Sequence, residues 1–168
     1  MNLIILDADG LIKVGKIGLL SLLAESYNCI ISKEVFKEAI ERGKKYFHED
    51  AFILESYINQ GTMKIMRTKQ NLKAKKLLQK AQLLGEGKKS SLHLFYNQNA
   101  LGIVSDDVAF LNLLDKYNVP YITPANLIPR LVELKKISKQ QGLTMIEKLR
   151  PYIRESIYKL VKKEIEVK

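Results

Sequence analysis

The sequence has few of the features that mark secreted, disulfide-bonded or membrane-embedded chains. It contains one cysteine and no tryptophan in 168 residues, so Cys29 has no partner in the chain for a disulfide. No cysteine or second histidine stands at metal-ligand spacing from His48 or His93, which we interpret as structural. No run of about 18 apolar residues occurs, and no basic segment precedes the apolar N-terminal stretch. We therefore expect no membrane span and no signal peptide, and predict a cytoplasmic protein.

Acidic residues are scarce relative to basic ones. The chain has 28 Lys and Arg against 18 Asp and Glu, a formal net charge of +10, which favours polyanionic partners. The excess is concentrated between residues 64 and 89, where Glu86 is the single acid. This segment predicts a phosphate-contacting surface, although a solvated lysine-rich helix face is the alternative. The candidate phosphate contacts are Lys69, Lys73, Lys76, Lys80, Lys88 and Lys89.

The N-terminal stretch contains the first candidate site. An apolar run over residues 3–6 predicts a buried strand, and it stops at Asp7, Asp9 and Gly10. The carboxyl ends of strands are where open α/β sheets bind ligands, and burying carboxylates is costly without a cation or hydrogen bonds. The alternative is that these aspartates only cap the following helix.

The same arrangement recurs later in the chain. Residues 101–104 form another short apolar run, followed by Asp106 and Asp107 and then by a helical pattern from Val108. One capping residue per helix would suffice, so capping alone predicts two such pairs of aspartates poorly. We therefore expect the two strand ends to form one site.

Strand and helix patterns alternate along the chain, which implies a short, largely parallel sheet covered by helices. Strands are expected at residues 2–6, 29–31, 63–66, 101–104 and 119–122. Helices are expected at residues 11–27, 32–43, 49–59, 69–84, after the 85–87 turn, from 108, from 124, at 138–149 and at 151–161. In such a sheet the ends of the first and fourth strands converge.

The four aspartates would then meet at one edge of the sheet. Several carboxylates at close quarters need a compensating charge, and all-oxygen ligands suit Mg²⁺ or Mn²⁺. Such a cation lowers the pKa of a bound water and stabilises charge on a phosphoryl oxygen, which suits hydrolysis of a phosphodiester. Glu38 projects from the margin of the buried face of its helix and is a further candidate, with an ion pair to Arg42 as the alternative.

Five segments, in order, resemble the landmarks of PIN domains, small metal-dependent ribonucleases that include many prokaryotic toxins. They are ILDADGLIKVGKIGLL, EVFKEAIERG, LGEGKKSSLHL, VSDDVAFLNLL and YITPANLIPRLVE. The resemblance covers residues 1–150, with residues 151–168 as a helical extension that frays toward its end. It implies a three-layer α/β/α fold with a mostly parallel sheet, Mg²⁺ or Mn²⁺ as cofactor, RNA as substrate, frequent homodimers and, in some members, a small antitoxin partner.

The resemblance also assigns the site residues. Asp7 corresponds to the first metal-binding acid, Glu38 to the second and Asp106 to the fourth, with Asp9 and Asp107 in support. These three would hold the metal whose bound water attacks the phosphodiester, in an endoribonuclease that acts as a toxin in toxin–antitoxin pairs.

The third acid is where this chain departs from the family pattern. In relatives a glutamate follows the glycine of the turn, and Lys88 stands at that position here. Glu86 would substitute if the turn shifted between Gly85 and Gly87. Otherwise the site holds one metal weakly, or the protein is an RNA-binding module that no longer cuts.

A second enzyme class stays open at this point. The DADG stretch also resembles the nucleophile and acid pair of haloacid-dehalogenase-type phosphatases, in which Asp7 would attack phosphorus and Asp9 would protonate the leaving group. Those enzymes usually carry a threonine after the glycine and then a loop insertion. Here Leu11 follows, and the helical pattern starts at once.

Overall fold

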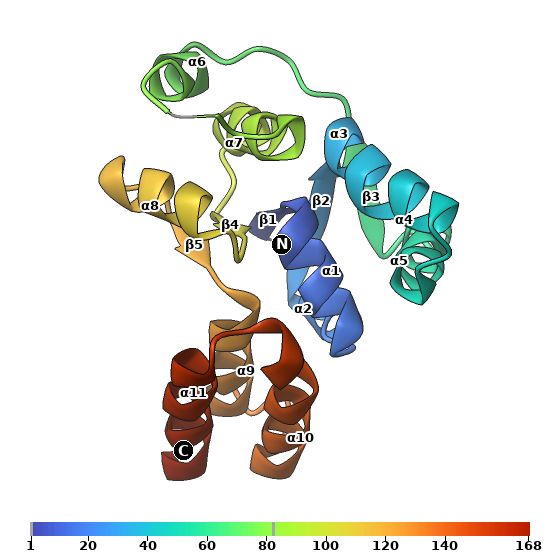
Figure 1. The fold of residues 1–168 in the computed structure, drawn as a ribbon, viewed down its shortest axis with the longest axis vertical. Coiled ribbons are helices and arrows are strands. Elements are labelled where there is room, and N and C mark those ends of the chain that lie inside the picture. The colour runs from blue at the N-terminus through green and yellow to red at the C-terminus, as the bar shows by residue number, and fades with distance from the viewer. Residues whose placement is uncertain (1, 82) are drawn as a thin grey trace.

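A five-stranded sheet forms the centre of the computed structural model, which describes residues 2–81 and 83–168 (Figure 1). Its order is β3-β2-β1-β4-β5, and every neighbouring pair is parallel. The expected α/β fold with a short parallel sheet between helices is thereby confirmed. The strands are β1 (Asn2–Leu6), β2 (Tyr27–Ser32), β3 (Met63–Met66), β4 (Gly102–Val104) and β5 (Tyr121–Ile122).

Helices connect the strands and cover the sheet. The first half of the chain contains α1 (Ala8–Lys16), α2 (Leu20–Ser26), α3 (Lys33–Phe36), the π-helical turn η1 (Lys37–Glu41), α4 (Arg42–Lys45), α5 (Glu49–Asn59) and α6 (Leu72–Leu78). The second half contains α7 (Glu86–Gln98), α8 (Val108–Lys116), α9 (Pro124–Glu133), α10 (Lys139–Leu149), the 3₁₀ turn η2 (Arg150–Tyr152) and α11 (Glu155–Val167).

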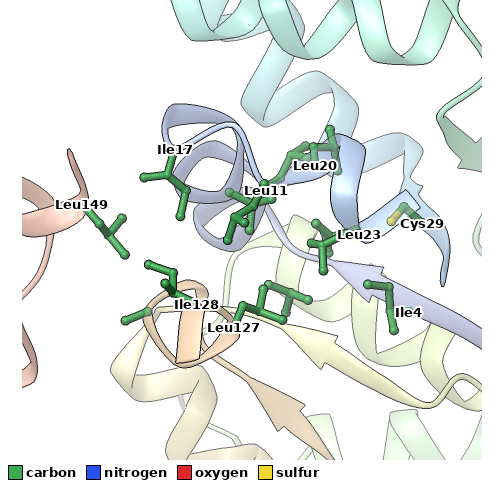
Figure 2. Packing of buried hydrophobic residues seen from close by; sticks show 14 of the residues in the cluster. Ile4, Leu11, Ile17, Leu20, Leu23, Cys29, Leu127, Ile128 and Leu149 are labelled. Carbon is green, nitrogen blue, oxygen red and sulfur yellow. The ribbon is translucent and has the colours of Figure 1, made fainter. Parts of the chain in front are cut away.

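Strand β1 is buried on both faces because its side chains alternate between two hydrophobic cores. Ile5 belongs to the core under α7 and α8. Ile4 and Leu6 belong to the larger core, which includes residues of α1, α2 and the C-terminal helices. Figure 2 shows Ile4 beside Leu23 on one side of this larger core, with Leu11 and Leu127 close by. A continuous apolar run is therefore the correct signature of this central strand.

The register between β1 and β4 brings the two acidic strand ends together. Leu6 is paired with Val104, and the backbone N–H of Asp7 donates to the Val104 carbonyl at 3.1 Å. The start of α1 packs closely on the same point, because a Cβ on Gly10 would lie 2.3 Å from the Val104 carbonyl oxygen. Only glycine fits there without moving the backbone.

Three expected helices differ from the structure. The helix at residues 11–27 is two helices, because Gly18 adopts a positive φ of 72° between α1 and α2. The helix from Ser32 does not end at Gly43 but continues through η1 to Lys45. The helix at residues 69–84 is only the short α6; Leu72, expected inward, is 78% exposed, and residue 82 lies outside the described residues.

The C-terminal segment packs into the larger core. Tyr158, Val161 and Ile165 of α11 are buried, and α11 contacts α9 and α10. Figure 1 shows these three helices together at one end of the molecule. The helix α11 reaches Val167, whereas fraying of the last residues and a domain boundary at residue 150 stay predictions. In the part of the chain that is described, none of the helices combines the length and apolar character needed to cross a bilayer.

Candidate functional site

Asp7 is the most deeply buried acid at the sheet edge. It is fully buried and is the N-cap of α1, where its Oδ1 accepts a hydrogen bond from the Gly10 N–H at 2.7 Å. Its Oδ2 accepts from the hydroxyl of Ser105. Burial, reinforced by the charge of Asp9, raises the Asp7 pKa to about 7 despite these hydrogen bonds and the nearby Lys88. Near neutral pH this carboxyl is therefore divided between its acid and carboxylate forms.

Helix capping, the alternative interpretation from the sequence, explains one aspartate of each pair. Asp107 is the N-cap of α8, and its Oδ1 accepts from the Phe110 N–H at 2.8 Å. Asp7 performs the same role for α1. Asp9 and Asp106 cap neither helix, and each is instead held by a lysine. The paired aspartates therefore combine a structural role with an electrostatic one.

Lys88 places its ammonium group among these acids. Its Nζ lies 3.1 Å from Oδ2 of Asp9 and 3.5 Å from Oδ2 of Asp107, and its side chain is only 15% exposed. Burial alone would lower the pKa of Lys88, but the hydrogen bond to Asp9 and the charges of Asp9, Asp107 and Asp7 outweigh it and raise that pKa. Lys88 is thus a permanent cation within the acidic edge.

Asp106 is neutralised by a second lysine, which the sequence did not reveal. Lys13, from α1, forms an ion pair with Asp106 across the site. Ser105, which bonds to Asp7, was also missed, although its position directly after β4 is the signal that identified the aspartates. Lys13 carries no comparable signal, because its contact spans 93 positions in the sequence.

Among the described residues, the two glutamates assigned from sequence take no part in the ion pairs of Lys13 and Lys88. Glu38 is solvent-exposed on η1, with its Oε2 so close to Gly87 that a Cβ there would lie 2.5 Å away. Glu86 is 76% exposed at the start of α7 and pairs with Lys89 at 2.7 Å. The turn therefore presents Lys88 to the acidic edge and Glu86 to solvent.

In this arrangement, lysines pair with the acidic-edge carboxylates of Asp9, Asp106 and Asp107. Within residues 2–81 and 83–168, no three His, Cys, Asp or Glu side chains are grouped so that they could hold a metal ion. The assignment of Asp7, Glu38 and Asp106 as metal ligands stays a prediction. The oxygens of Asp9 and Asp107, which have the right chemistry for Mg²⁺ or Mn²⁺, face the ammonium of Lys88.

The predicted phosphate contacts divide into two groups. Lys69, Lys73, Lys76 and Lys80 are solvent-exposed, on α6 or in the segments that flank it. Lys88 is engaged in the acidic edge, and Lys89 is partly occupied by Glu86. The first group is therefore the accessible part of the basic surface.

The fold and this edge define an α/β protein with acidic groups at the carboxyl ends of adjacent parallel strands. A family model described as a PIN domain matches residues 3–167. The chain therefore belongs to the PIN-domain family, and its fold is of the nuclease type. PIN domains are generally nucleases that use divalent metal ions and act on RNA. Comparison with curated proteins finds none that matches significantly. Family membership also sets aside the phosphatase interpretation of the DADG stretch.

Proposed function

We propose that this chain is a PIN-domain RNA-binding protein in which Lys88 replaces the cation of the acidic site, so that binding outweighs metal-dependent cleavage. The observation that carries this proposal is the position of the Lys88 ammonium, 3.1 Å from Asp9 and 3.5 Å from Asp107. A positive charge held there satisfies the carboxylates that would otherwise need a metal ion.

RNA is the proposed ligand for two reasons. PIN domains act on RNA, and the chain carries a net charge of +10 with exposed lysines on and around α6. Lysine contacts to phosphates give affinity without sequence preference. We therefore expect the wild-type protein to bind single-stranded RNA more tightly at low salt.

The decisive experiment compares binding and cleavage in the same preparation. Fluorescence anisotropy with a labelled single-stranded RNA measures binding, and gel electrophoresis after incubation with MnCl₂ or EDTA measures cleavage. We expect binding, and cleavage no greater than that of an Asp7→Asn variant. Manganese-dependent cleavage that Asp7→Asn abolishes would contradict the proposal.

That outcome would favour the second candidate function, a Mg²⁺- or Mn²⁺-dependent endoribonuclease. One observation favours it specifically: the β1–β4 register brings the aspartates that follow both strands to one edge. Under this candidate Asp7, Glu38 and Asp106 are the metal-binding acids. A toxin role, a homodimer and a small antitoxin partner also stay predictions; light scattering of the purified chain tests the dimer.

A further inference from the structure

A cavity of about 370 Å³ lies next to the acidic edge and is not used by the function proposed above. It is open to solvent on one side and is bordered by α1, η1, α4 and α5, which pack against one another; Figure 1 shows α4 and α5 together on the same side of the molecule. Glu38 lines the cavity and also touches Gly87 at the start of α7, one residue before Lys88. The cavity therefore begins where the acidic edge ends.

The walls of this cavity suit a flat, partly apolar ligand. Ala39 and Ala51 are buried behind it, and Ile12 contributes further apolar surface. Tyr46 and His48 stand at its rim, with ring centroids 6.4 Å apart and planes inclined at 50°. Tyr46 is 60% exposed. An exposed aromatic ring beside an apolar recess provides a stacking surface for a nucleobase.

The polar groups of the cavity complement the edge of a base. Arg42 and Glu38 stand four residues apart, yet neither takes part in an ion pair within the described residues. The other charges facing the cavity, Lys16 and Asp50, neutralise each other. A free guanidinium donates to base carbonyl or ring nitrogen acceptors, and a free carboxylate accepts from exocyclic amino groups.

A second cavity of about 480 Å³ continues the first, sharing Lys16, His48 and Asp50 with it. Lys148 and Tyr152 line its far side. Lys16 lies 4.5 Å from the centroid of the Tyr152 ring. Glu49 also lines this second cavity, and because Lys16 is paired with Asp50, Lys148 is the lysine of the groove that can meet a phosphate. Aromatic rings beside such a cation are typical of single-strand binding sites, in which bases stack and phosphates meet cations.

We propose that the cavity between η1, α4 and α5 binds one unstacked base of a single-stranded RNA, with Tyr46 as its stacking partner and Arg42 at its edge. This proposal rests on RNA being the ligand of the chain. It assigns Glu38 to base contact, a role separate from metal binding.

The test uses the full chain and three variants. Tyr46→Ala removes the stacking ring, Tyr46→Phe keeps it, and Phe52→Ala removes a ring that is 48% exposed on α5 but lines neither cavity. The probe is a single-stranded RNA carrying one 2-aminopurine, whose fluorescence falls when the base stacks. We expect Tyr46→Ala to weaken binding roughly tenfold and to abolish the quenching. Tyr46→Phe and Phe52→Ala should behave like the wild type.

A second probe separates this proposal from the proposed function. Saturation-transfer NMR with nucleoside 5′-monophosphates reports base binding without a polynucleotide. If the wild type binds RNA and Tyr46→Ala binds and quenches equally well, the base site is refuted while RNA binding stands. If RNA does not bind but a mononucleotide signal is present and lost in Tyr46→Ala, the cavity takes a free nucleotide, and both the RNA base site and the proposed function are refuted. Absence of both signals refutes both.

Discussion

Replacing Lys88 by glutamate tests directly whether this lysine stands in for a metal ion. The substitution removes the ammonium that lies 3.1 Å from Asp9 and 3.5 Å from Asp107 and puts a carboxylate in its place. The local charge falls by two units. We expect the metal-free variant to be less stable than the wild type and to bind Mn²⁺ more tightly.

The magnitude follows from the exposure of the groups. Asp9 is 46% exposed and Asp107 33%, so each ion pair with Lys88 is partly screened and is worth about 1 kcal/mol. The variant loses two attractions and gains two repulsions of similar size, so its free energy of unfolding should fall by about 4 kcal/mol. For a chain of this length the Tm should fall by roughly 8–16 °C.

Metal binding should restore most of this loss. Mn²⁺ at about 100 times its Kd stabilises the folded state by about 2.7 kcal/mol, about two thirds of what the substitution removes. Differential scanning fluorimetry in EDTA and in increasing MnCl₂ measures both effects. Lys89→Glu is the matched control, because Lys89 is partly exposed and pairs with Glu86, away from Asp9 and Asp107. A manganese response in Lys88→Glu no larger than in the wild type and Lys89→Glu would refute the reasoning.

Three further predictions concern the surroundings of the site. The folded-state pKa of Asp7 is raised from 3.8 to about 7, so its contribution to stability is complete below the pKa of the unfolded chain and is lost as pH rises through the folded pKa. Relative to Asp7→Asn, the free energy of unfolding of the wild type should fall by about 2 kcal/mol between about pH 5 and pH 7, measured by urea unfolding. Lys76→Ala with Lys80→Ala should reduce the log–log salt slope of RNA binding by about 1.4, whereas an unchanged slope would remove α6 from the interface. Gly10→Ala should cost about 3 kcal/mol, because its Cβ would overlap a β4 carbonyl oxygen, whereas Gly85→Ala, with nothing within 4 Å, should unfold at nearly the wild-type temperature.

The strands could be predicted because each carries a self-contained signal. The strand from Leu3 to Leu6 packs against apolar cores on both faces, so it appears in the sequence as a continuous apolar run without alternating polar residues. The basic helix failed for the opposite reason. Leu72 fits a helical pattern, but an apolar period does not say whether a neighbouring element covers that face, and Leu72 is 78% exposed.

The site was predictable only as far as strand ends determine it. Parallel strands bring their carboxyl ends to one edge, so the sequence correctly predicted that the ends of β1 and β4, which Asp7 and Asp106 follow, lie side by side. The resemblance also placed Lys88 at the position of the third acid, whereas Lys13, which reaches the edge from α1, was not predicted. Which side of the 85–87 turn faces the acids depends on how α7 docks, and no local pattern encodes that docking.

Lys88 need not abolish metal binding to control it, because the ammonium and a metal ion compete for the same carboxylates. If its two ion pairs are together worth about 2 kcal/mol, the apparent metal affinity of the wild type is about 30-fold below that of a site without the lysine. A proton is the second competitor, because the Asp7 pKa lies at about 7. Lys88→Met removes the competing ammonium, but it also removes a charge that lowers the Asp7 pKa. Near neutral pH a proton on Asp7 then competes with the metal ion in place of the lysine. At about pH 8.5 the proton competes little, so the ratio of the metal affinities of Lys88→Met and the wild type measures the contribution of the two ion pairs alone.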